Sequence, residues 1–477
     1  MLITLAAPAF AGTWYIENGD ITVKAGETKG TNKVSQGENP EVEDTNTVIT
    51  NSDKDKASSN TVTIEAKDKD DKVEVTLKDV NIDTSSRSEA AVSVTGEGNT
   101  NIELDGDNAL KSDIYSSGIS SSGSLTISGG ENDSLTAQGG SGADGIYSSG
   151  SLTISGGTVT ANGGSGGGGD GGDGIWSSGG VTISGGSTVT ANGGNGGNVS
   201  GDGIRSDSGD VTISGGTVKA AGGDSKDGYG GDGIRSGGVV TISGNTVNAA
   251  GGYGGKVGGY GICSFDRVAI SGGTVEAAGG NGSTGGGSGI YSSVIDLSGS
   301  LELTAKAGSP TGKALLQNGR ELDLDTIKDK LGPGAKVTAT DANGETKQVS
   351  IPRPVEPEEP VIPEESSSSS DGGSATPSAP VSPLPGLTVT DRDGQRISYT
   401  STQSGNTLTV CVGRLTASFR ISLAALRQLR AEGIETITFQ TILCSTTLSV
   451  DELLAMGGED AEAVLTHRFT DSSLTVG

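Results

Sequence analysis

The chain has 477 residues and a formal net charge of −27 at pH 7. It contains 83 glycines but only five phenylalanines and two tryptophans, and hydrophobic residues make up 31%. This composition excludes a compact core of large side chains and favours a repeat architecture that buries ladders of Val and Ile. The acidic balance makes nucleic acid a poor partner, because binding it needs many cationic contacts. An acidic surface suits an extracellular protein and also holds divalent cations.

Residues 1–11 are typical of the end of a secretory signal. They combine a short apolar run with an Ala9-x-Ala11 cleavage site. The basic n-region is missing, so we expect the printed start to lie inside a longer signal. No run is long enough to span a bilayer. We therefore expect an extracellular or cell-surface protein without a membrane span.

Residues 12–116 alternate between apolar and polar positions, as in Val62-Thr-Ile64 and Val73-Glu-Val75. The distance from Val92 to Ile119 is 27 residues, which equals the first period of the clearer repeat that follows. This predicts earlier, more charged coils, the first of which acts as a cap.

An internal repeat of 27 to 30 residues dominates the chain from residue 117 to residue 300. Each copy contains a Gly-Ile pair, then a strand such as Val181-Thr-Ile183, then a strand such as Val189-Thr-Ala191, and then a Gly-rich turn. Three short strands per copy predict an all-β, right-handed parallel β-helix whose Ile, Val and Ala side chains stack inward. We expect the glycines at corners that need positive φ.

The repeat fades after residue 300, and the rest of the chain changes in composition. A short helix at Asp325–Leu331 and a strand at Lys336–Thr340 are expected to cap the last coil of a β-helix that spans residues 12–350. Residues 351–386 form a linker rich in Pro, Glu and Ser. Residues 387–477 predict a small α+β module of unknown role, with a helix at Leu423–Glu432 capped by Ser422.

Cysteine usage leaves the redox compartment open. We expect that Cys411 and Cys444 can pair within the C-terminal module, which leaves Cys263 over. The chain has no Cys/His metal spacing, and His467 is its only histidine, so histidine-based catalysis or zinc binding is nearly excluded.

The residue after each Gly-Ile pair predicts a binding column, because it faces outward where Ile faces inward. Neighbours in this column are expected about 5 Å apart. Aromatic rings stack on sugar faces and Arg pairs with carboxylates, so the column is a candidate carbohydrate site. The alternative is that aromatic residues only cover a sheet face. The candidate carbohydrate-binding residues are Tyr147, Trp176, Arg205, Arg235 and Tyr291.

Aspartates before the Gly-Ile pairs and in the Gly-rich turns offer stacked oxygen ligands. Carboxylates and exposed turn carbonyls suit Ca²⁺, which would offset the repulsion of stacked anions. The alternative is that Asp is a turn residue that bonds its own backbone. The candidate calcium ligands are Asp144, Asp170, Asp173, Asp202, Asp227 and Asp232.

The motif Asp-Gly-Ile-x-Ser followed by Val-Thr-Ile-Ser-Gly-Gly-Thr-Val resembles the calcium-associated, carbohydrate-binding β-helix proteins of Gram-positive anaerobes. The likeness covers about residues 90–300. It implies a surface-exposed protein that takes plant cell-wall polymers such as cellulose and acidic pectic sugars. Ser117, Tyr260 and Ser288 replace the Asp of the motif, so the resemblance confines any ion sites to the middle coils.

Two other classes of function are open. A surface stalk or adhesin would use the β-helix as a stiff rod and the C-terminal module for recognition or anchoring. A polysaccharide lyase would need a cation site and a basic residue over one groove, for which Arg205, Arg235 and Lys219 are candidates. We expect a secreted, non-enzymatic, polysaccharide-binding β-helix protein.

Overall fold

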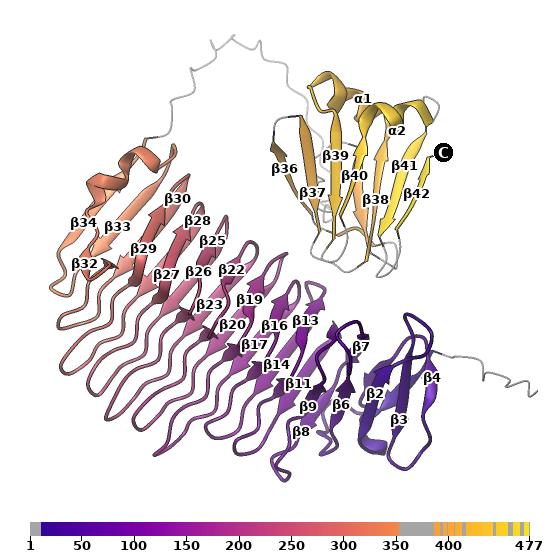
Figure 1. The fold of residues 1–477 in the computed structure, drawn as a ribbon, viewed down its shortest axis with the longest axis horizontal. Coiled ribbons are helices and arrows are strands. Elements are labelled where there is room, and N and C mark those ends of the chain that lie inside the picture. Colours follow the sequence, from indigo (N-terminus) through magenta and orange to yellow (C-terminus); the bar gives the residue numbers. More distant parts are fainter. Residues whose placement is uncertain are drawn as a thin grey trace, which may run out of the picture. The chain divides into compact units, whose positions relative to one another are not determined.

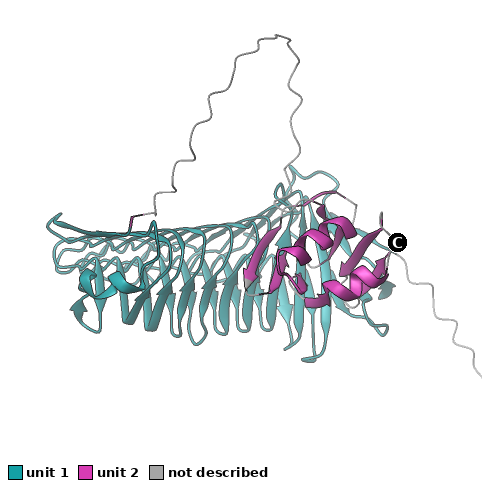
Figure 2. Cartoon of the chain, turned by 90° about the horizontal axis from the view of Figure 1, so that it is seen from above, with its two compact units in different colours: residues 1–351 teal, residues 352–477 magenta. Residues whose placement is uncertain are grey.

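The computed structural model describes residues 11–352 and most of the C-terminal segment, namely residues 386–391, 395–397, 399–404, 406–412, 416–441, 445–456, 461–467 and 472–476. The chain separates into two compact units, residues 1–351 and 352–477 (Figure 2). In the first unit, parallel coils stack into a β-solenoid of about 13 turns (Figure 1). The predicted parallel β-helix is therefore confirmed. The predicted signal remnant and linker lie almost wholly outside the described residues.

Each central coil has three short strands on three sides, as the repeat predicts. The first side consists of β12 (Ile119–Ser121), β15 (Ile146–Ser148), β18 (Ile175–Ser177), β21 (Ile204–Ser206) and β24 (Ile234–Ser236). The second side consists of β13 (Ser124–Gly129), β16 (Ser151–Ile154), β19 (Gly180–Ile183), β22 (Val211–Ile213) and β25 (Val240–Ile242). In the last two complete coils these sides merge into β27 (Ile262–Ile270) and β29 (Ile290–Leu297).

The third side forms an 11-stranded sheet of its own. Its central strands are β14 (Ser134–Gln138), β17 (Thr158–Asn162), β20 (Thr188–Asn192), β23 (Thr217–Ala221), β26 (Thr246–Ala250), β28 (Gly273–Ala278) and β30 (Leu301–Lys306). Equivalent residues face one another from coil to coil on every side, for example Ile146 with Ile175 and Val159 with Val189. Apart from a register shift between Ser264 and Arg267, where β27 pairs with β29, the register is kept from coil to coil, so each repeat position forms a straight column.

Inward columns of Ile, Val, Leu and Ala form the core, as predicted. Ile146, Ile175 and Ile204 are fully buried in the first column, and Val189 and Ala191 are fully buried in the third. Small side chains fill this narrow interior in regular layers, so the chain needs few aromatic residues to exclude water. Buried serines line the corner between the first and second sides, where Ser177 Oγ donates to the carbonyls of Gly150 (2.8 Å) and Gly180 (2.9 Å).

The N-terminal coils carry an antiparallel cap. The strands β2 (Ile21–Ala25), β3 (Asn32–Gln36) and β4 (Val42–Asp44) pair antiparallel with one another, while β2 pairs parallel with β6 (Val62–Glu65). The remaining elements are β1 (Thr13–Tyr15), η1 (Ile16–Asn18), β5 (Val48–Thr50), β7 (Lys72–Lys78), β8 (Asn81–Asp83), β9 (Val92–Thr95), β10 (Asn99–Asp105) and β11 (Asp107–Lys111). The predicted early coils and cap are present.

The C-terminal end of the solenoid is also capped. After β31 (Leu315–Gln317) and β32 (Arg320–Glu321), the predicted short helix is a 3₁₀ helix, η2 (Leu324–Lys330), that buries Leu324 and Ile327. The predicted strand is β33 (Lys336–Thr340), and β34 (Thr346–Ser350) pairs antiparallel with it. The antiparallel strand occupies the edge that would otherwise accept another coil.

The Gly-rich segments are loops whose two arms run side by side and hydrogen-bond to each other. This corrects the prediction of simple corner turns with positive φ. Within one loop the N–H of Gly172 donates to Gly164 O at 3.0 Å, and the N–H of Gly164 donates to Ala143 O of the preceding coil at 2.7 Å. A Cβ added at Gly164 would lie 1.6 Å from Gly140 O, although Gly164 does not have positive φ. Glycine is required here because backbones pack directly against each other. Positive φ does occur at the corner before the third side, as at Gly216 (φ 82°).

The second unit is small and strand-rich, with two helices among its described residues. One sheet has the order β35 (Leu387–Thr390), β38 (Ala417–Ser422), β41 (Glu462–His467) and β42 (Ser472–Val476). The other has the order β36 (Thr400–Ser404), β37 (Thr407–Cys411), β39 (Thr436–Gln440) and β40 (Ser445–Ser449). The helices are α1 (Leu423–Ala431), which Ser422 caps as predicted, and α2 (Val450–Met456).

Cys411 and His467 both belong to the second unit. Cys411 carries a free thiol, and its predicted partner Cys444 lies outside the described residues. His467 is buried, its Nε2 lies 2.9 Å from Thr446 Oγ1, and burial lowers its pKa. Across the described ranges, no helix has the length and apolar character that a membrane crossing requires.

Candidate functional site

The predicted outward column exists on the first side of the solenoid. Register places Tyr147 opposite Trp176, Trp176 opposite Arg205, and Arg205 opposite Arg235. All four side chains are half-buried. The rings of Tyr147 and Trp176 stack with centroids 4.6 Å apart and planes 6° apart. Each ring therefore packs one face against its neighbour.

A second aromatic stack includes a residue that the sequence analysis did not assign to the column. Tyr260 stacks on Tyr291 with centroids 4.9 Å apart and planes 14° apart. The column position between Arg235 and Tyr291 belongs to Cys263, which is only 1% exposed. The short Cys263 side chain leaves space there, and Tyr260 enters it from the neighbouring Asp column. Burial raises the pKa of Tyr260 to about 12, with further contributions from Cys263 and Asp232.

Both arginines of the column are held by acidic neighbours and one of them by an aromatic ring. Arg205 Nε donates to Asp207 Oδ1 at 2.8 Å, and its Nη1 lies 4.0 Å from Asp173 Oδ2. Arg235 Nη1 lies 3.6 Å from Asp232 Oδ2. The Arg235 guanidinium also lies over Phe265, 5.3 Å from the ring centroid. The two side chains remain 36% and 37% exposed, so each keeps donor groups available to a ligand.

Four of the six predicted calcium ligands form a continuous ladder beside this column. The backbone N–H of each Asp donates to Oδ1 of the Asp one coil earlier, from Asp173 to Asp144 (2.7 Å), Asp202 to Asp173 (2.5 Å) and Asp232 to Asp202 (2.6 Å). The N–H of Tyr260 donates to Asp232 Oδ1 (2.6 Å) and ends the series. Asp170 and Asp227 lie exposed in the Gly-rich loops and do not join the ladder.

Burial makes the ladder favour its protonated form. Removal from water raises the pKa of Asp144 to about 6 and, with the charge of Asp202, raises that of Asp232 to about 8. Burial followed by the charges of its two neighbours raises the pKa of Asp173, and burial raises that of Asp202. Asp232 Oδ2 is buried without a hydrogen bond, its nearest charge being Arg235.

In each carboxyl group of the ladder, one oxygen accepts a hydrogen bond from a backbone N–H. Calcium prefers six to eight oxygen ligands around one point, whereas these carboxyl groups lie in a line one coil apart. Among the described residues, no group of three or more acidic, Cys or His side chains is arranged to hold a metal ion. Calcium binding therefore stays a prediction.

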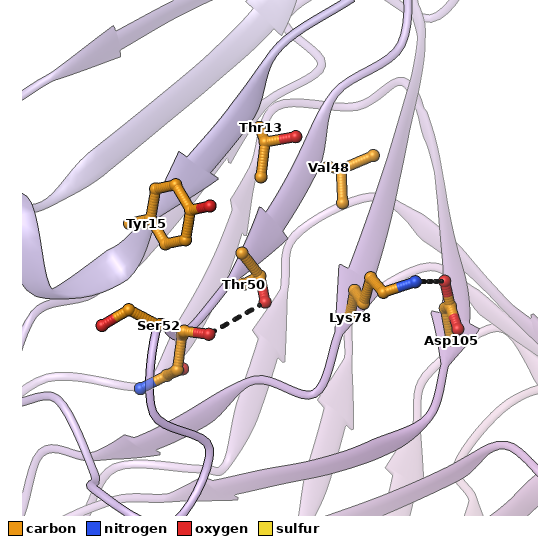
Figure 3. Close-up of a pocket in the computed structure, with 8 residues that line it drawn as sticks. Thr13, Tyr15, Val48, Thr50, Ser52, Lys78 and Asp105 are labelled. Carbon is orange, nitrogen blue, oxygen red and sulfur yellow. Dashed lines mark hydrogen bonds and ion pairs between the residues drawn. The ribbon is translucent and has the colours of Figure 1, made fainter.

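A separate hollow of about 570 Å³ lies near the N-terminal end (Figure 3). One row of paired residues crosses it, Tyr15, Thr50, Lys78 and Asp105, and Lys78 Nζ lies 2.8 Å from Asp105 Oδ2. The hollow offers hydroxyl groups and one partly exposed ring beside a closed ion pair. It gives a polymer fewer stacking contacts than the column, so the column is the stronger candidate.

The fold and the column define a β-solenoid protein with an aromatic and cationic surface on one side. Comparisons with family models, with curated proteins and with solved structures found no match. Of the three candidate bases for a lyase, Arg205 and Arg235 lie on the first side next to the Asp ladder, and Lys219 lies on β23 of the third side.

Proposed function

We propose that this protein binds an extended, uncharged polysaccharide along the outward column, without chemical change to the polymer. The observation that carries the proposal is the straight row in which Tyr147 and Trp176 stack next to Arg205 and Arg235. Aromatic faces bind the apolar faces of sugar rings, and guanidinium groups donate to sugar hydroxyls. A rigid row of strands holds these groups in place before binding, so little entropy is lost.

Charge favours an uncharged ligand over an acidic one. The net charge is −27, and both arginines of the column already lie next to aspartates. An acidic polymer would have to displace these neighbours and approach a negative surface. A neutral cell-wall glucan would not have to displace the aspartates and would not be repelled by the negative surface. The proposal includes an extracellular or cell-surface location, which the signal-like residues 1–11 support.

The test is calorimetry with soluble neutral glucans, such as hydroxyethyl cellulose, and with polygalacturonate as the acidic comparison. We expect saturable binding of the neutral polymer. Trp176→Ala should weaken that binding by about 1–3 kcal/mol, as for a residue at the centre of a contact surface. Tyr115→Ala is the control, because Tyr115 is 84% exposed on the loop between β11 and β12, outside the column.

The same titration separates the alternatives. Equal binding by wild type and Trp176→Ala would refute the column as the site. Binding that EDTA abolishes would support the calcium prediction, and unsaturated products released from polygalacturonate would identify a lyase. A rigid stalk is the second candidate, favoured by the uninterrupted solenoid of about 13 turns. It predicts no binding of either polymer to the wild-type protein.

A further inference from the structure

We propose that the outward column is one bipartite site, in which Tyr260 and Tyr291 form a second sugar-stacking cluster that acts together with Tyr147 and Trp176. This inference rests on the proposed function and specifies its ligand. It assigns Tyr260 as a sugar-binding residue and requires a glycan long enough to reach both clusters.

The two clusters lie on the same side of the same rigid body. Six successive first-side strands, from β15 to β29, pair in parallel without a register slip in the column, and they carry Tyr147 at one end and Tyr291 at the other. Five coil steps separate these ends, which is about 24 Å. Trp176 and the Cys263 position that Tyr260 covers are three steps apart, or about 14 Å.

The inner members of the two stacks border the arginine pair. Trp176 precedes Arg205 in the column, and the space over Cys263, which Tyr260 fills, follows Arg235. Each stack places two near-parallel rings one coil step apart, with Trp176 next to the Arg205 position. Phe265, 52% exposed beneath Arg235, adds apolar surface to the second cluster. A ligand lying along the column would meet rings, then guanidinium donors, then rings again.

Ligand length follows from this spacing. A pyranose unit is on the order of 5 Å long, the same as one coil step, so three units bridge the arginines and more are needed to reach rings at both ends. Occupying the second cluster then becomes an intramolecular event with a high effective concentration. We therefore expect affinity to rise steeply, rather than evenly, with chain length.

The experiment is calorimetric titration of the full chain with cello-oligosaccharides from the trisaccharide to the hexasaccharide. For the wild type we expect at least a tenfold gain in affinity between these lengths, which is less than the roughly hundredfold or more that linked sites can provide. Tyr260→Ser should remove the gain and leave trisaccharide binding at Trp176 unchanged. Serine is a native side chain at this repeat position, as Ser288 shows.

Tyr291→Ser is a second variant that breaks the same stack, and Ser120 occupies its column position in an earlier coil. Tyr229→Ser, which removes an exposed ring from a Gly-rich loop, is the control and should keep the gain. A length-dependent gain that survives in both Tyr260→Ser and Tyr291→Ser would overturn the bipartite site and leave the proposed function intact. Failure of the wild-type protein to bind the hexasaccharide or the polymer would overturn both.

Discussion

Asp232→Asn should reduce the loss of stability that the solenoid undergoes as pH rises. Burial and the charge of Asp202 raise the pKa of Asp232 to about 8 in the folded protein, against an ordinary value of 3.8 for an aspartate. The folded state therefore holds this proton more tightly than the unfolded chain. The stabilisation is complete below the unfolded pKa and is lost as pH rises through the folded pKa. Asn keeps an oxygen that accepts the Tyr260 N–H and cannot ionise.

The burial of Asp232 determines how much the free energy of unfolding changes with pH and over which pH interval it does so. One carboxyl group changes the free energy of unfolding by up to about 1.4 kcal/mol per pH unit while it is protonated in the folded state alone. For Asp232 this interval runs from the ordinary aspartate pKa of 3.8 to about 8. Asp144 adds to the same trend up to about 6. Asp83 acts with the opposite sign only in stronger acid, because hydrogen bonds from Ser85 and then from Lys111 outweigh its partial burial and lower its pKa.

Thermal unfolding of the wild type and of Asp232→Asn, followed by circular dichroism from about pH 5 to pH 9, measures the difference in slope. The free energy of unfolding of the variant should fall less steeply with pH than that of the wild type, by roughly 1 kcal/mol per pH unit. Asp227→Asn, an exposed loop carboxylate, should match the wild type. A wild-type stability that rises with pH would refute the reasoning. It would indicate that the ladder is anionic and neutralised by a bound cation, which titration with calcium would then identify.

Two further changes test how the coils pack. Gly231→Ala should cost about 1–3 kcal/mol or more in urea unfolding, because the new Cβ would lie 1.8 Å from Gly201 O, while Gly168→Ala, with no atom within 4 Å, should have little effect. Ile204→Ala should cost about 2–5 kcal/mol by leaving a cavity in the fully buried first column, and Thr190→Ala on an outer face should change unfolding by about 0.5 kcal/mol or less. Equal effects for either pair would contradict the packing described above.

The sequence was sufficient to predict the coils because their period repeats with little change. Alternation within each short strand distinguishes Ile175 from Trp176, and a constant period places equivalent residues in register. The inward columns, the outward column and the Asp column all follow from these two facts. Both caps were predicted, but the 3₁₀ type of the C-terminal helix and the antiparallel pairing of the N-terminal cap needed the structure, because they occur once and have no repeat to define them.

The Gly-rich loops and the state of the Asp ladder were harder to predict for a physical reason. Glycine permits positive φ and also permits backbone contact, and the sequence does not distinguish the two uses. Gly164 is needed for backbone contact, because the carbonyl of Gly140 occupies the place that a side chain would take. The burial that raises the pKa of Asp173 likewise depends on loops that close over it. The stacked carboxyl groups suggested cations, and the burial that raises their pKa values was not visible in the sequence.

In a solenoid, departures from the repeat define the limits of a site. Tyr260 replaces the Asp of the ladder and Cys263 replaces the large side chain of the column, and both changes occur in the same coil. The N–H of Tyr260 still donates to Asp232, so the backbone pattern continues while the row of carboxyl groups ends. Its ring then takes the space over Cys263 and stacks on Tyr291. One pair of substitutions thus ends the ladder and extends the aromatic surface, which is why Tyr260 is the residue that best tests whether the column acts as a single binding site.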